Sequence, residues 1–141
     1  MRRALLIVLL LTTACASVPR ETPEAAVARF VAAFNALDAA AMQTLFAPDA
    51  TAFLPMPQYG ARLDGREAIM AALSPLFAEE KTRSGSLHLT QKGLHIQTYG
   101  STAVATFDVG TEAVYSRRTL VLRARGGRWE IVHLHASNVR P

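Results

Sequence analysis

The chain has 141 residues, with 15 lysines and arginines against 11 acidic residues, a formal net charge of +4 and a single cysteine. This length suits one domain with one core. The arginines of its second half are scattered and lack interleaved aromatic residues, which argues against nucleic-acid binding. One cysteine excludes an intrachain disulfide and a cysteine-based zinc site.

The N-terminal segment is typical of a bacterial export signal. Arg2 and Arg3 precede an apolar run over 4–11, which is too short to span a bilayer because a span takes about 20 apolar residues. The ending Thr-Thr-Ala-Cys resembles a lipobox, so we predict that residues 1–14 are a signal peptide and that Cys15 is lipidated. The alternative is an ordinary secretory leader that leaves Cys15 as a free thiol. Loss of the leader removes two arginines and lowers the net charge to +2.

We therefore expect a protein of the bacterial cell envelope that a lipid anchor at Cys15 holds on a membrane. Residues 15–21 would be a short tether, and residues 22–141 would be the folded domain. Ala16, which follows the cysteine where an aspartate would favour retention, resembles the outer-membrane sorting pattern of Gram-negative lipoproteins. A secreted or periplasmic soluble protein is the alternative location.

Helical signals come first in the domain. The sequence Thr-Pro-Glu at 22–24 places a hydroxyl cap, a proline and an acid at a helix start, and apolar residues follow at helical spacing. Asp38 can cap a second short helix, which we expect to end at Pro48. A short strand over 50–54 and a third helix over about 66–77 follow, and a polar break is expected after that helix.

Strand-like segments make up the rest of the chain. They cover 86–98, 102–115, 117–125 and 128–138. The pair Gly126-Gly127 between the last two predicts a two-residue hairpin turn. Helices followed by a run of antiparallel strands predict an α+β fold, in which a bent sheet wraps around helices.

Three stretches, at 34–50, 65–69 and 127–137, resemble the SnoaL-like branch of the nuclear-transport-factor-2-like superfamily. The last, Gly-Arg-Trp-Glu-Ile-Val-His-Leu-His-Ala-Ser, is similar to the final strand of the calmodulin-dependent kinase association domain. The resemblance covers 22–139. It implies a cone-shaped fold of about three helices on a strongly curved antiparallel sheet, often dimeric, with a pocket inside the cone. Members include isomerases, dehydratases, cyclases, hydrolases and non-catalytic binding or assembly domains, so the fold does not define the function.

The hairpin register predicts one wall of the pocket. If Gly126-Gly127 forms the turn and period-two geometry holds, Leu120 faces His133 and Arg118 faces His135. One face of the hairpin then carries Arg118, Leu120, Leu122, Trp129, Ile131, His133, His135 and Ser137. This face is apolar near the turn and polar at its far end, as expected of a ligand pocket, and Tyr59 is a further candidate at the pocket mouth.

The opposite face of the hairpin is too apolar for open solvent. It carries Thr119, Val121, Val132, Leu134 and Ala136. We therefore expect a homodimer that forms through the outer face of the sheet.

The two histidines have three interpretations. They can be structural residues that form hydrogen bonds within the fold, or they can orient a polar or anionic ligand together with Arg118. They can also act as a catalytic acid–base pair, with Asp108 as a candidate acid, because histidine titrates near neutral pH. A metal site would need a third ligand, so we predict neither a metal nor another cofactor.

One position argues against an isomerase. In the ketosteroid isomerase relatives the general base is an aspartate before a proline, and Leu54-Pro55 stands there in this chain. Leucine cannot accept a proton. We therefore expect an envelope lipoprotein whose cone binds a small, partly apolar ligand or a protein partner, without catalysis. The alternatives are an isomerase, dehydratase or cyclase-type enzyme that uses His133 or His135 with Asp108, and a dimeric assembly module.

Overall fold

The computed structural model describes residues 20–111 and 115–139. The predicted signal peptide, Cys15 and most of the predicted tether lie outside these residues. No helix in the described ranges is long and apolar enough to cross a membrane.

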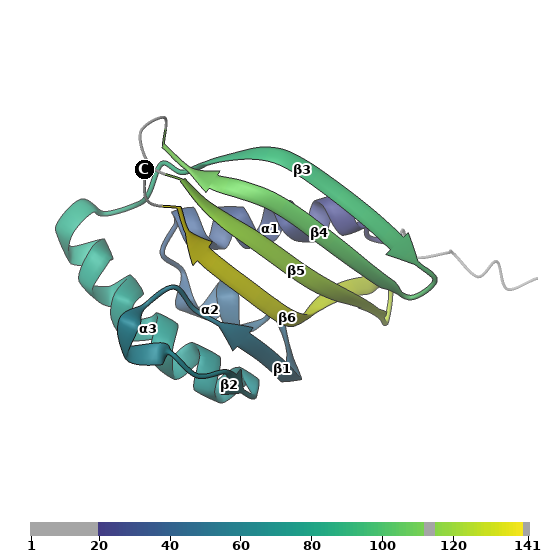
Figure 1. Cartoon of the computed structure of the whole chain (residues 1–141), viewed down its shortest axis with the longest axis horizontal. Helices are drawn as coiled ribbons and strands as arrows, with labels where there is room; N and C mark the ends of the chain where they lie inside the picture. Colours follow the sequence, from purple (N-terminus) through teal and green to yellow (C-terminus); the bar gives the residue numbers. More distant parts are fainter. Residues whose placement is uncertain (1–19, 112–114, 140–141) are drawn as a thin grey trace, which may run out of the picture.

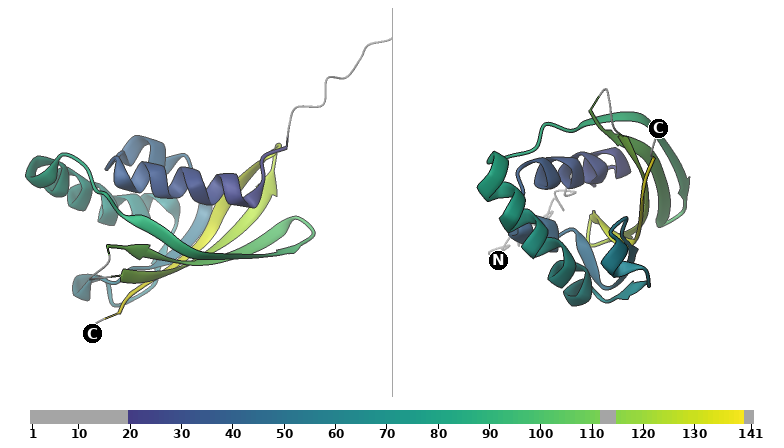
Figure 2. Two further views of the ribbon diagram at one scale, coloured as in Figure 1. Left: turned by 90° about the horizontal axis from the view of Figure 1, so that it is seen from above. Right: turned by 60° about the vertical axis from the view of Figure 1, so that its left-hand side comes forward.

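Three helices pack against one curved sheet (Figures 1 and 2). The helices are α1 (Pro23–Asn35), α2 (Ala39–Gln43) and α3 (Arg66–Ser84), and a short 3-10 turn, η1, covers Pro57–Tyr59. The strands are β1 (Phe46–Phe53), β2 (Leu63–Asp64), β3 (Thr90–Tyr99), β4 (Thr102–Gly110), β5 (Tyr115–Arg125) and β6 (Arg128–Asn138). They form one sheet in the order β2-β1-β6-β5-β4-β3, and all neighbours are antiparallel except β1 and β6, which are parallel. The predicted α+β cone is thus confirmed.

The two predicted helix starts are confirmed. The Thr22 hydroxyl accepts a hydrogen bond from the backbone N–H of Ala25 at 3.2 Å, and the Asp38 carboxylate accepts one from that of Ala41 at 2.9 Å. Each side chain satisfies a donor that the first turn of a helix leaves unpaired.

Two predicted boundaries are wrong. The second helix does not reach Pro48, because Phe46 already pairs with Ile131 of β6. Pro48 is tolerated in β1 because the strand is irregular there, between Phe46 and Thr51, and needs no ladder donor. The third helix does not end near residue 77, and the polar segment expected as a break at 81–85 is helical up to residue 84. This segment is the exposed last part of α3, which ends at Ser84 before Gly85 with a φ of 74°.

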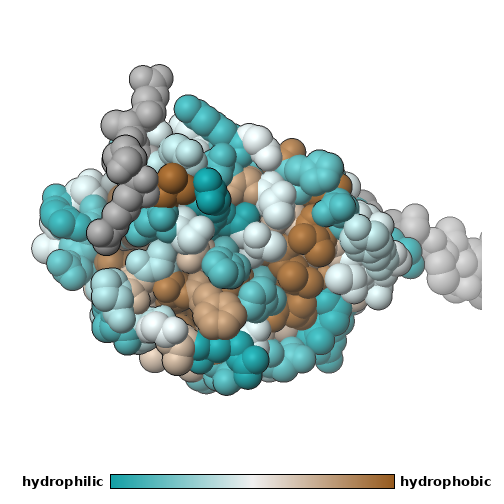
Figure 3. All heavy atoms as spheres, in the orientation of Figure 1, coloured by the Kyte–Doolittle hydropathy of each residue, from teal (hydrophilic) through white to brown (hydrophobic). Residues whose placement is uncertain are grey.

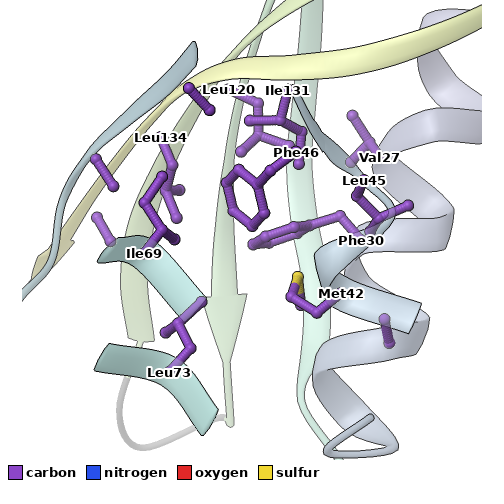
Figure 4. Close-up of a cluster of buried hydrophobic side chains, with 14 of the residues drawn as sticks. Val27, Phe30, Met42, Leu45, Phe46, Ile69, Leu73, Leu120, Ile131 and Leu134 are labelled. Atoms are coloured by element: carbon purple, nitrogen blue, oxygen red, sulfur yellow. The ribbon is translucent and has the colours of Figure 1, made fainter. Parts of the chain in front are cut away.

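The core lies between the concave face of the sheet and the three helices. Figure 4 shows Phe30 of α1, Met42 of α2 and Ile69 of α3 converging on Phe46 and the inward residues of β5 and β6. The sheet curves around these helices, so the helices cover its inner face and leave its outer face open (Figure 2).

Candidate functional site

The hairpin of β5 and β6 begins as predicted. Gly126 and Gly127 have φ values of 58° and 80°, which suit a two-residue turn that follows the twist of the strands. The predicted pairing then holds from Arg125 opposite Arg128 to Leu122 opposite Ile131.

A β-bulge changes the register beyond that point. Val121 pairs with His133, so Val132 is an extra residue on β6, and Thr119 pairs with His135. The predicted pairs Leu120–His133 and Arg118–His135 are therefore wrong. A shift of one residue sends every following side chain to the other face of a sheet.

The bulge separates the residues that we expected to share one face. Leu134 and Ala136, expected on the outer face, are buried on the inner face with Leu120 and Arg118. His133 and His135 lie on the outer face instead, and His135 is exposed. The hairpin thus presents an almost entirely apolar inner face with one cation.

A cavity of about 200 Å³ lies inside the cone, between α1, α3 and the inner faces of β5 and β6. Its walls are apolar apart from Arg118 and Asn138. Leu54, the residue before Pro55, lines it. The lining residues are Phe30, Phe34, Leu54, Pro55, Met56, Leu73, Leu76, Arg118, Leu134, Ala136 and Asn138.

Arg118 is the only charged residue among the described lining residues, and its residue surface is only 8 % exposed. One Nη–H donates to the backbone oxygen of Arg117 at 3.0 Å. No carboxylate of the described residues forms an ion pair with it. Burial lowers the pKa of Arg118 to about 10, so the guanidinium is still charged at neutral pH. The cavity therefore contains a buried positive charge that has no counter-ion among the described residues.

The two histidines form a separate cluster on the outer face. The Thr51 hydroxyl and His133 Nδ1 are 2.7 Å apart, and the ring of Phe53 lies 6.0 Å from that of His133 and 5.7 Å from that of His135. Burial lowers the pKa of His133 below its ordinary value, and the nearby His135 and Arg62 lower it further. In Figure 3, which views the outer face, hydrophobic side chains gather over the sheet between polar ones.

The other predicted site residues lie elsewhere. Trp129 is near the hairpin turn, where its indole N–H donates to the backbone oxygen of Glu21 at 3.0 Å. Asp108 and Ser137 are on the outer face, where Arg117 lies between them in the strand pairing. Tyr59 packs half-buried against the core without lining the cavity.

Sequence analysis missed most of the cavity wall. Phe30, Phe34 and Leu73 were recognisable only as apolar faces of helices, and nothing in the sequence distinguishes a wall from a core contact. Asn138 lies at the end of β6, and the shifted register brings it to the cavity. Across the described ranges, no group of three potential ligands could hold a metal ion.

Comparison with known proteins agrees with this architecture. The family model of the SnoaL-like domain matches residues 24–141. No curated protein matches the sequence significantly.

Solved structures share the fold over most of their length. A Thiobacillus denitrificans protein described as a candidate calcium/calmodulin-dependent protein kinase type II association domain has 26% identity and a TM-score of 0.71, covering 87% of this chain and 99% of its own. A candidate dehydratase of the NTF2-like family from Streptomyces avermitilis has 17% identity and a TM-score of 0.68, covering 82% and 93%. A candidate ketosteroid isomerase from Parabacteroides distasonis has 21% identity and a TM-score of 0.67, covering 86% and 90%. The last two likenesses concern the fold alone.

Proposed function

Because the chain belongs to the family of SnoaL-like domains, we propose that its cone binds a small, partly apolar anion and does not catalyse proton transfer. The observation that carries this proposal is the buried guanidinium of Arg118, which has no carboxylate partner among the described residues. A buried charge is costly unless something pairs with it. An anionic ligand would supply the missing partner.

The cavity limits the size and character of that ligand. A volume of about 200 Å³ is below the roughly 300–1,000 Å³ of sites for drug-sized molecules. Phe30, Phe34 and Leu73 provide apolar contacts on the helix side of the cavity. A single carboxylate on a short aliphatic or aromatic body fits these walls, with the carboxylate at Arg118.

The same geometry supports binding without catalysis. General acid–base catalysis needs a group that gains or loses a proton near neutral pH. Among the described lining residues only Arg118 titrates, and its pKa of about 10 keeps it protonated. The alternative enzyme would use His133 or His135 with Asp108, and all three lie on the outer face of the sheet.

We further propose that the protein acts in the bacterial envelope as a lipoprotein anchored through Cys15. The support for this is the leader over 1–14 and its lipobox-like ending. The ligand would then be a compound that reaches the envelope. Mass spectrometry of the protein purified from membranes tests this assignment, because a diacylglycerol on an N-terminal Cys15 has a defined mass. A chain that still carries residues 1–14 would contradict it.

Benzoate and benzyl alcohol test the binding proposal as a matched pair, because both carry one aromatic ring and only benzoate is charged. Titration calorimetry should show benzoate binding about 10–100-fold more tightly than benzyl alcohol, as expected for a buried charge-assisted hydrogen bond. The substitution Arg118→Met should remove this preference. Equal affinity of the native protein for both compounds would contradict the proposal.

Arg117→Met is the matched control. Arg117 precedes Arg118 on β5, but its side chain is exposed on the outer face. The control removes the same charge from the same strand, so it should keep the preference for benzoate. If both substitutions reduced the preference equally, the effect would come from the overall charge and not from a group in the cavity.

The dimeric assembly module remains a second candidate because of the outer face. Phe53 is 38% exposed there, and Val104 and Val121 are half-buried on neighbouring strands. A second copy of this chain placed on this face would cover these side chains. Assembly and ligand binding use opposite faces of the sheet, so one protein can do both.

A further inference from the structure

A separate group of arginines lies at the end of the molecule away from the cavity, where two hairpin turns and the start of α1 meet. Figure 1 shows that the β3–β4 turn, the β5–β6 turn and the N-terminal end of α1 lie at the same end of the molecule. The backbone N–H of Glu21 donates to the oxygen of Gly127 at 3.0 Å, and that of Ala124 donates to the oxygen of Ser101 at 2.8 Å. These bonds hold the start of the domain and both turns together.

A groove of about 460 Å³ runs between these segments. Arg20, Arg125 and Arg128 line it, and all three residues are exposed. None of them forms an ion pair with a carboxylate of the described residues. We call these three arginines, with the groove between them, the basic end.

Glu21, the one acid among the described residues of the groove, is already paired with a cation. Glu21 accepts two hydrogen bonds from the Arg29 guanidinium, at 2.6 and 3.0 Å, and one from the backbone N–H of Trp129 at 2.9 Å. These bonds lower the pKa of Glu21 even though burial acts in the opposite direction. The charge that the groove presents to solvent is therefore positive.

The chain enters the domain at this end. Arg20 is the first described residue, and only four residues separate it from Cys15. Four or five extended residues span about 17 Å at most. If Cys15 carries a lipid anchor, as proposed above, the basic end is the part of the domain that the tether keeps nearest to the membrane.

We propose that the basic end docks on an anionic membrane surface and that its groove receives a lipid phosphate group. Arginine binds phosphate through two parallel N–H donors, and basic residues close to a membrane surface are attracted to anionic lipids. Tyr99, which is 62 % exposed beside the β3–β4 turn, is the kind of aromatic residue that settles at a membrane interface. Docking would fix the orientation of the cone, with the end of the molecule that holds the cavity directed away from the membrane.

Trp129 provides the measurement, because it lines the groove and is the only tryptophan in the chain. The mature protein is reconstituted in vesicles of phosphatidylcholine, with or without phosphatidylglycerol, that contain a phosphatidylcholine with a nitroxide on its headgroup. We expect quenching of Trp129 to rise several-fold with phosphatidylglycerol and to fall again in high salt. Quenching that does not depend on phosphatidylglycerol would overturn the proposal.

The double substitution Arg125→Gln and Arg128→Gln tests the residues. It should reduce the phosphatidylglycerol-dependent quenching by about tenfold or more, since each basic residue contributes on the order of fivefold. Arg117→Gln, at the other end of β5, is the matched control and should leave the quenching unchanged. An equal effect of the control would overturn the proposal, because it would reflect net charge alone.

Two further measurements, the mass of the protein and competition by inorganic phosphate, separate membrane docking from the lipid-anchor proposal and from binding of a soluble phosphate compound. The proposal rests on the lipid anchor, and the mass of the same sample reports whether Cys15 carries it. If the lipid is absent but vesicles with phosphatidylglycerol still quench Trp129, the proposed lipid anchor is wrong and the proposed docking of the basic end is supported. If the lipid is present without such quenching, the anchor is supported and the docking proposal is overturned. Inorganic phosphate should reduce the phosphatidylglycerol-dependent quenching of Trp129 no more than chloride does at equal ionic strength. A stronger reduction by phosphate would indicate that the groove binds a soluble phosphate compound and would overturn the proposal that it docks on a membrane.

Discussion

Arg118 is the residue on which the proposed anion binding rests. Its guanidinium is buried in an apolar wall, and its one hydrogen bond to a described residue goes to the backbone oxygen of Arg117. Desolvation by burial explains why its pKa falls to about 10. Arg118 lines the cavity, but His133 and His135, which were expected beside it, lie on the outer face of the sheet.

We expect Arg118→Met to stabilise the ligand-free protein by about 1–3 kcal/mol, because methionine fills similar space without a buried charge. Urea unfolding of the native protein and the variant measures this difference. The benzoate preference should disappear in the same variant. A variant that is less stable would show that Arg118 makes a structural contact that outweighs its desolvation.

His133 makes stability depend on pH. Its pKa in the folded protein lies below the ordinary 6.5, so the unfolded chain takes up a proton at a higher pH than the folded chain does. Stability is therefore fully present above about pH 7 and declines as the pH falls through 6.5 toward the lower pKa of the folded state.

The substitution His133→Asn should flatten this dependence. Asparagine can keep a hydrogen bond to Thr51 from about the position of Nδ1, but it does not titrate. Melting temperatures measured from about pH 7 to about pH 5 should fall less in the variant than in the native protein. Parallel curves for the two proteins would show that other groups cause the decline.

Among the secondary-structure elements, the β5–β6 hairpin has a turn that was predicted correctly and a strand register that was not. Gly126-Gly127 identified the turn because few other residue pairs adopt two positive φ values. The bulge at Val132 has no such marker, since valine is an ordinary strand residue. The rule that apolar side chains face the core would have placed Leu134 and Ala136 on the inner face. That placement conflicts with the prediction that His133 and His135 face the pocket.

The turn itself gives a test. Gly127→Ala should destabilise the protein by about 1–2 kcal/mol, because a Cβ at a φ of 80° is strained even though the space around it is open. Gly60→Ala is the matched control, since Gly60 has a φ of −69° and should change stability by less than about 0.5 kcal/mol. Thermal unfolding compares the two. Equal effects would mean that the strain at Gly127 is not what matters.

At the scale of the whole molecule, the curved sheet separates two surfaces. The inner face and the helices enclose the core and the cavity, and the apolar periodicities of the sequence predict which helix faces are buried but not which residues line the cavity. The outer face carries the histidine cluster and the half-buried valines. The fold class could be predicted because periodicity and turn residues are local signals. The division of residues between the two faces could not, because it depends on one irregularity in the pairing of β5 with β6.

We propose that two copies associate through the outer face, with Val121 near the centre of the contact. Leu134 cannot test this dimer, since it is buried inside the cone. Val121→Glu should give a monomer that keeps its fold and its benzoate preference, because a charge cannot be buried unpaired in an interface. Light scattering after size exclusion measures the mass. A dimer that persists in the variant would place the interface elsewhere.

The proposed function depends most directly on where an anion binds. The crystal structure of the protein with para-bromobenzoate tests this directly, because the anomalous signal of bromine locates the ligand without reference to the protein. We predict the bromine inside the cone, between α1 and α3, with the carboxylate on the Arg118 guanidinium. A bromine on the outer face beside Phe53 and His135, with no bromine inside the cone, would contradict the proposed function.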